Sequence, residues 1–326
     1  MNPTFENAYH GSLVADALAM PAHWYYDREA LRRDYGELPA YAAPRNPHPD
    51  SILWRSRYEP LNDQADILHD QAQYWGRRGV HYHQFLQAGE NTVNFKLAAE
   101  LVRWWRQRGG YNPDAWLERY IEVMRTPGWH GDTYVEEYHR GFFERLAQGK
   151  PPRKCSIRDE HIGGLALVPA LNLVLSGEDL ETRRRTIKEH VGLTHAHANV
   201  LRAADTLVRL LDRVAGGTPL RDAIRDEAGD WLSTTKAAKW ATQPDDHVVG
   251  QRFSPACYID QSMPASLFLA WKYHDDFEGG IRANALVGGD NCHRGAVVGS
   301  LLAAANGIPG PWLDGLVALR PAPVEL

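Results

Sequence analysis

The chain has 326 residues, a formal net charge of −5 and a pI near 6.3. A weakly acidic chain without an extended basic stretch has no electrostatic reason to bind nucleic acid or an anionic membrane, so neither is expected as a partner. No apolar run approaches the roughly 18 residues of a transmembrane helix, and the first residues lack a signal-peptide pattern. Three widely spaced cysteines argue against a disulfide framework and favour a reducing, cytoplasmic compartment.

Helical periodicity dominates the chain. Apolar residues recur at helical spacing, and Gly, Asn or Pro marks several of the ends. No segment shows the alternation of β-branched residues that strands require. The sequence therefore predicts an all-α fold in a single domain over residues 1–326, with helices over residues 93–107, 112–121, 199–215, 264–273 and 294–305.

The most informative segment is a glycine turn, Gly288-Gly289, that runs into a helix rich in small residues. The first turn of this helix carries Asp290, Cys292 and His293, which can all bind metals or act in catalysis. A helix N-terminus favours anions and thiolates because its first amide groups lack intrahelical partners. We interpret this segment as catalytic or metal-binding chemistry held on a rigid element.

Two further segments combine polar and small residues. Pro21 ends a helix, which leaves His23 and the aromatic residues 24–26 on the following loop. Residues 90–92 (Glu-Asn-Thr) either cap the next helix or converge on a cation or substrate hydroxyls. His81 and His83 would share one face of an extended segment, which is a weak metal signal.

The remaining segments place histidines and acidic residues at expected helix starts. Asp132 or Thr133 is expected to cap the helix that follows them. His161 precedes a glycine pair, and His195 lies shortly before the helix near residue 199. A lone buried histidine is usually a hydrogen-bonded core residue, but several beside small residues at helix starts favour a pocket.

In chain order, these segments resemble the motifs of the ADP-ribosylglycohydrolase family, which includes dinitrogenase-reductase-activating glycohydrolase and a lens crystallin. Residues 15–23 are similar to the family pattern Gly-Asp-Ala-Leu-Gly-x-Pro-x-Glu, and residues 288–293 to Gly-Gly-Asp-Thr-Asp-Thr. The other matches are residues 89–92, 161–169 and 194–195. The resemblance implies a compact, orthogonal multi-helix domain with a cleft where these loops meet. It also implies two magnesium ions that polarise ribose hydroxyls and position water at the anomeric carbon.

This sequence departs from the family pattern at most of the metal ligands. His23 replaces a Glu, Glu90 and Asn91 replace two Asp, and Cys292 and His293 replace an Asp and a Thr, whereas Asp290 is kept. Magnesium prefers hard oxygen ligands, whereas imidazole and thiolate suit transition metals. Ala166 also stands where the family has an Arg. The resemblance implies a divalent metal, with Zn, Fe or Mn favoured over the family's Mg, bound by His23, Glu90, Asp290, Cys292 and His293.

Three hypotheses follow. In the first, the protein is a hydrolase that cleaves an N- or O-glycosidic, ribosyl-type bond of a small nucleoside-like or ADP-ribose-related substrate, with a retuned metal site. Its catalytic residues are Glu90, Asp290 and Cys292, and its substrate-binding residues are Trp24, Tyr25, Asn91, His161, His195 and Gly289. In the second, it is a pseudoenzyme that binds a nucleotide-like ligand. In the third, a metal-free hydrolase uses Cys292 as nucleophile. We expect a small-molecule partner and a monomer or small homo-oligomer.

Overall fold

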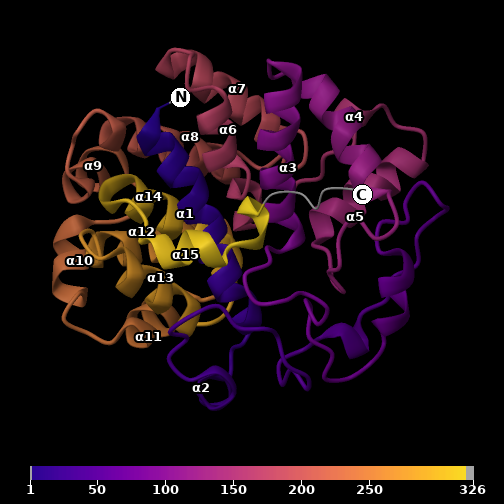
Figure 1. The fold of residues 1–326 in the computed structure, drawn as a ribbon, viewed down its shortest axis with the longest axis horizontal. Helices are drawn as coiled ribbons and strands as arrows, with labels where there is room; N and C mark the ends of the chain where they lie inside the picture. Colours follow the sequence, from indigo (N-terminus) through magenta and orange to yellow (C-terminus); the bar gives the residue numbers. More distant parts are fainter. Residues whose placement is uncertain (1, 321–326) are drawn as a thin grey trace.

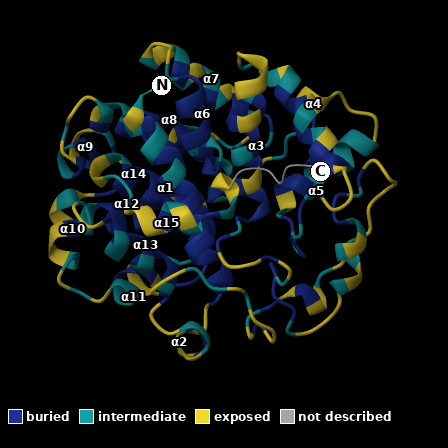
Figure 2. Ribbon diagram, in the orientation of Figure 1, coloured by how far each residue is buried: buried dark blue, intermediate teal, exposed yellow. Residues whose placement is uncertain are grey.

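Two helices, α1 (Pro3–Ala19) and α14 (Asn291–Asn306), lie next to each other inside the molecule, and most of the other helices pack around them (Figure 1). The computed structural model describes residues 2–320. Nearly every residue of α14 up to Ala303 is buried, as the dark blue of both helices shows (Figure 2). A helix that is apolar or small on all sides is typical of a core position.

The other α-helices are distributed over the whole described chain. None of the helices within residues 2–320 combines the length and apolar character required to cross a membrane. Outside the helices, the described residues form only isolated β-bridges and no sheet, so the all-α prediction is confirmed. The helices are α2 (Arg28–Tyr35), α3 (Val93–Arg108), α4 (Pro113–Met124), α5 (Glu137–Ala147), α6 (Val168–Val174), α7 (Leu180–Gly192), α8 (Ala198–Ala215), α9 (Leu220–Glu227), α10 (Thr234–Trp240), α11 (Asp245–His247), α12 (Ile259–Lys272), α13 (Phe277–Leu286) and α15 (Gly310–Gly315).

Sequence periodicity located the helices well and some of their first residues less well. Helices α3, α4 and α8 begin within one residue of the expected positions. Helix α12 begins five residues before the expected start, so that Pro264 lies inside it. A proline there removes one backbone hydrogen bond, and the burial of the surrounding helix face outweighs that loss. Helix α14 begins at Asn291, which places Asp290 at its N-terminal boundary.

The contact between α1 and α14 is close because small residues meet at its centre. A Cβ atom at Gly299 would overlap the carbonyl oxygen of Gly11, and one at Gly295 would lie 3.1 Å from the Cβ of Ala15. Residue numbers rise along α1 as they fall along α14, so the two helices run antiparallel. The C-terminal end of α1 and the loop after it therefore lie beside the first turn of α14. This packing brings His23 to Asp290.

A long irregular segment connects α2 to α3 and returns to the same place. Residues 39–47 of this segment are exposed or half-buried, and the segment is visible as the purple chain below and beside α5 (Figure 1). Leu53, Val80 and Tyr82 form a small apolar cluster that anchors the segment, with Trp24 packed against it. Toward the end of the segment, His81 and His83 lie buried in the interior.

We expect the substitution Gly299→Ala to lower the free energy of unfolding by about 1–3 kcal/mol, because overpacking forces the two helix backbones apart. Gly177→Ala is the matched control, since a Cβ there would meet nothing within 4 Å. Urea titration of both variants measures the effect. Equal stabilities would show that the contact between α1 and α14 tolerates separation.

Candidate functional site

A cluster of buried ionisable side chains lies where the loop after α1 meets the start of α14. His23 and Asp290 are fully buried, and His293 is 1% exposed. Ionisable groups are rarely buried in this way unless they are paired or bind a ligand. Asp290 directly precedes α14 and His293 lies in its first turn, so their side chains, three residues apart, lie close together.

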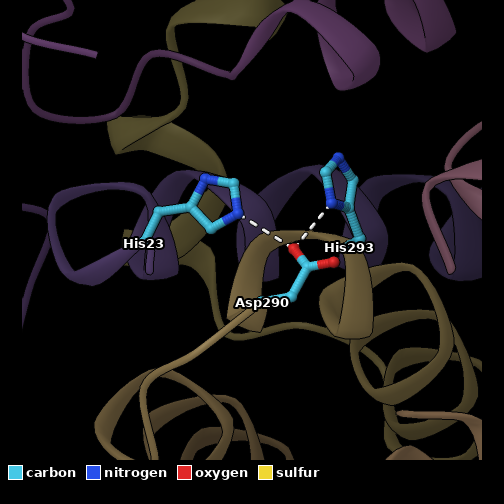
Figure 3. A group of neighbouring side chains, drawn as sticks. All are labelled: His23, Asp290 and His293. Carbon is cyan, nitrogen blue, oxygen red and sulfur yellow. Dashed lines mark hydrogen bonds and ion pairs between the residues drawn. The ribbon is translucent and has the colours of Figure 1, made fainter. Parts of the chain in front are cut away.

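The two imidazole rings converge on one carboxylate oxygen. His23 Nε2 lies 2.9 Å and His293 Nδ1 lies 2.6 Å from Asp290 Oδ1 (Figure 3). One potential ligand atom from each of the three residues lies within 4.8 Å of the others. Within residues 2–320, this is the one group of three or more His, Cys, Asp or Glu side chains placed closely enough to hold a metal ion. The other oxygen, Asp290 Oδ2, is buried without a hydrogen-bond partner.

The electrostatics of the cluster are set by burial and by mutual pairing. Although burial alone would raise the pKa of Asp290, the adjacent His293 holds that pKa well below its usual range. Burial lowers the pKa of His23 to about 3. For His293, burial is outweighed by Asp290 and Glu136, which raise its pKa to about 9. The cluster therefore holds a carboxylate, a neutral imidazole and an imidazolium at neutral pH.

Glu136 forms the outer edge of the cluster. Its Oε1 lies 3.3 Å from His293 Nε2, and its side chain is 13% exposed. It precedes the first residue of α5, and burial raises its pKa to about 7. The same nitrogen of His293 contacts the side-chain amide of Asn94, whose Oδ1 accepts hydrogen bonds from Tyr138 and His139 at 2.6 Å each.

A second row of polar groups leads away from His23. Its Nδ1 lies 2.7 Å from His83 Nε2, and His83 Nδ1 lies 2.5 Å from Asp132 Oδ1. Asp132 and Thr133 were expected to cap a helix. That prediction is wrong, because α5 begins at Glu137 and the Asp132 carboxylate turns inward to His83. His81 does not join this row, since its Nε2 donates to the carbonyl of Pro21.

The structure does not bring residues 90–92 to the cluster around Asp290. Glu90 accepts a hydrogen bond from the backbone of its own turn, at Gln87. Asn91 and Thr92 instead hold the carboxylate of Asp16, with four hydrogen bonds of 2.8 to 2.9 Å from these two residues to Asp16 and to the backbone of α1. The expected roles of Glu90 as base or ligand and of Asn91 in substrate binding do not fit these positions. These residues join α1 to α3.

Cys292 also lies away from the cluster. Its thiol is buried against the carbonyl oxygen of Asp16, with 3.8 Å between the two atoms. Burial raises its pKa well above the ordinary value, so the helix N-terminus does not produce a thiolate here. The expectation that Cys292 is a ligand or a nucleophile is corrected by its position on the face of α14 that packs against α1.

The aromatic loop after His23 divides into a buried and a partly exposed part. Trp24 stacks on His23 with ring centroids 4.0 Å apart, and it has a φ of 58°, which is unusual for a residue with a side chain. Tyr25 is fully buried, and its hydroxyl group donates a hydrogen bond to Asp34. Contrary to the expectation that it binds substrate, its side chain does not face the cluster. The backbone of Gly289, whose φ is 63°, forms hydrogen bonds with the backbones of Trp24 and Tyr25. Gly289 therefore holds the loop after α1 against the start of α14.

His161 and His195 both lie close to Asp159. His161 Nδ1 lies 3.0 Å from Asp159 Oδ1, while His195 is buried with its Nε2 at 3.9 Å from the same oxygen. Cys257, which comes just before Tyr258, is the one cysteine of the chain that is partly exposed. The β-bridge between His161 and Tyr258 brings this part of the chain beside His161.

Sequence reasoning missed the partners His83, Asp132, Glu136 and Asn94 as members of the cluster. All four lie far from residue 290 in the chain, and no local pattern distinguishes Asp132, Glu136 and Asn94 from cap or surface residues. His83 did carry a signal, because two histidines at alternate positions were recognised as a weak metal motif. That signal identified the correct loop.

The residues present fit a divalent transition metal. Two imidazole nitrogens and a carboxylate oxygen are common ligands of zinc and iron, and the buried oxygen of Asp290 offers a further bond. The remote nitrogen of each histidine lies beside another polar side chain, as is usual for metal-bound histidines. An octahedral, all-oxygen magnesium shell is not what these residues provide.

Residues 4–322 match the family model described as ADP-ribosylglycohydrolase, and the chain belongs to this family. Among solved structures, it is similar to a chain from an "ADP-ribosylglycohydrolase-related protein complex", with a TM-score of 0.60 and 20% sequence identity. The similarity covers 96% of this chain and 92% of that chain, and it supports the fold. A search of curated proteins finds no match.

We expect iodoacetamide to alkylate Cys257 in the native protein and to leave Cys155 and Cys292 unmodified, because the latter two are buried. Mass spectrometry of tryptic peptides locates the adducts. Denaturation in urea is the control and should expose all three thiols. Rapid native labelling of Cys292 would contradict the position described here.

Proposed function

We propose that the protein is a metal-assisted hydrolase that cleaves an N- or O-glycosidic, ribosyl-type bond in a nucleoside-like or ADP-ribose-related small molecule. Membership of the ADP-ribosylglycohydrolase family supports the hydrolase class. The observation that carries the proposal is the convergence of His23 Nε2 and His293 Nδ1 on the carboxylate of Asp290. Two imidazole nitrogens and a carboxylate oxygen that converge in a buried position form a ligand set that suits a divalent cation.

In this proposal, His23, Asp290 and His293 hold one divalent cation, with Zn, Fe or Mn preferred to Mg. When bound, such a cation supplies Lewis-acid stabilisation of substrate oxygens and a water of lowered pKa. The chain itself contributes burial, which excludes bulk water and strengthens every charge interaction at the site. Asp290, which matches the family motif, and the replaced residues around it support the proposal of a retuned site.

Glu136 is the group we assign to proton transfer. It lies at the partly exposed edge of the cluster, and its Oε2 is buried without a hydrogen-bond partner. A carboxylate in this position can accept a proton from water and return it to the leaving group. Its pKa, raised by burial to about 7, supports the same role. Glu136 thereby takes the place that sequence reasoning gave to Glu90.

Trp24 and Tyr26 are the groups we assign to substrate binding. Trp24 stacks directly on His23, and Tyr26 is 47% exposed on the same loop. Aromatic faces of this kind stack on planar rings or on the apolar faces of sugars. A strained backbone conformation at Trp24 is consistent with a functional role for its side chain. These features favour a small-molecule substrate.

We expect hydrolysis of an N-ribosyl or O-ribosyl test substrate to require a divalent metal and to be abolished in His293→Ala. The test follows released ribose or ADP-ribose by chromatography, with protein treated with chelator and then reloaded with Zn²⁺, Fe²⁺, Mn²⁺ or Mg²⁺. Cys292→Ala is the control and should keep its activity, since Cys292 faces α1. Ligand binding without turnover under every metal would favour a pseudoenzyme, and full activity after complete chelation would contradict metal assistance.

We expect Glu136→Gln to reduce kcat by about 10²–10⁴-fold, the usual contribution of a general acid–base group. The change keeps the shape of the side chain and removes its capacity to exchange a proton. Glu137→Gln is the matched control, because that neighbour is exposed. A kcat close to that of the wild type in Glu136→Gln would show that proton transfer depends on another group.

A further inference from the structure

The row of groups that leads away from His23 has a geometry that a simple space-filling role does not require. The rings of His23 and His83 are parallel to within 3°, their centroids are 5.0 Å apart, and their facing nitrogens are 2.7 Å apart. These three values are compatible only with two rings that lie edge to edge in a common plane. This is the arrangement of a linear N–H···N hydrogen bond.

The direction of each hydrogen bond in this row follows from the groups at its far end. Asp132 is buried, and its Oδ1 lies 2.5 Å from His83 Nδ1. An ionised carboxylate only accepts, so His83 Nδ1–H donates to it, and a neutral imidazole then has an acceptor at Nε2. His23 must therefore donate from Nδ1. Its Nε2, which faces Asp290, is left with a lone pair.

We propose that Asp132 and His83 are positioning residues that fix the tautomer and the plane of His23, so that its Nε2 is presented as a metal ligand beside Asp290. The two neutral imidazoles carry two N–H groups for three contacts, and the contact without a proton is the one between His23 Nε2 and Asp290 Oδ1. A cation at this point provides the positive charge that both atoms require. The inference rests on the proposed function, because it assumes that a metal binds there.

The surroundings of His83 support this assignment over a general packing role. His81 lies two residues away and is equally buried, yet both of its ring nitrogens pair with backbone groups, of Pro21 and of His83. His48 likewise pairs with the backbone, at the carbonyl of His23. Of these three neighbouring histidines, His83 is the one whose ring nitrogens connect a carboxylate to His23.

The test compares metal binding in the wild type, in Asp132→Asn and in Asp159→Asn, each as the full chain. Asp159→Asn is the matched control, since it makes the same change at another buried carboxylate that pairs with a histidine. We expect Asp132→Asn to weaken Co²⁺ or Zn²⁺ binding by about 10–100-fold, as removal of an outer hydrogen-bond partner commonly does. Asp159→Asn should leave the affinity unchanged. Calorimetry with a competing chelator gives the dissociation constants.

Nitrogen-15 NMR of the histidine rings provides a readout that a structural role would not change. In the metal-free wild type, His23 should carry its proton on Nδ1, and in metal-free Asp132→Asn this preference should be lost. His83→Gln, which keeps a polar side chain but cannot relay the hydrogen-bond direction, should give the same loss if Asp132→Asn fails to fold.

The outcomes separate the two proposals. Tight metal binding by the wild type with equal affinity in Asp132→Asn, or a His23 proton on Nε2 in the metal-free protein, overturns the positioning role and leaves the proposed function in place. A wild type that binds none of the metals overturns both.

Discussion

The close antiparallel packing of α1 against α14 is the constraint on which the candidate site depends. Gly11, Gly295 and Gly299 allow the two helix backbones to approach without intervening side chains. Because the helices are antiparallel, the short segment that follows α1 and the residue that precedes α14 come together. His23 and Asp290 are thus brought into hydrogen-bond distance although 267 positions separate them in the chain. Larger residues at these glycines would separate the helices and with them the two halves of the site.

A buried cluster with this many ionisable groups is stable only if each charge has a partner. Removing one member of a buried ion pair typically costs about 3–5 kcal/mol, because the other charge is left without compensation. Here the groups form a continuous row from Asp132 through His83, His23 and Asp290 to His293. Burial and mutual pairing push their pKa values in opposite directions. Such separation of pKa values is more common at functional sites than in structural cores.

The fold could be predicted from the sequence because helical periodicity and end signals are local. Helix α3, for example, follows directly from its apolar spacing and from the glycine pair after it. The candidate site could be predicted in part, since Asp290 and His293 are three residues apart at the start of a helix that the glycine turn indicates. His23 followed from the family motif.

Other members of the site could not be predicted, because the direction of each side chain determines whether the residue belongs to the site. Cys292 lies on the same helix turn as its neighbours but on the face that packs against α1, and no spacing rule applied to one helix reveals which face is covered. Glu90 was expected in the site from its motif, but it closes its own turn. Glu136 and Asp132 come from a loop whose sequence is typical of helix capping. Their roles depend on tertiary contacts with His293 and His83.

Anomalous diffraction from crystals grown with a transition metal tests the central claim most directly. Data collected on both sides of the metal's absorption edge locate the ion independently of its effect on activity. The account predicts one strong anomalous peak within bonding distance of His23 Nε2, His293 Nδ1 and the carboxylate of Asp290. A peak beside Asp16 and Thr92 instead, or no peak in crystals soaked at saturating metal, would contradict it.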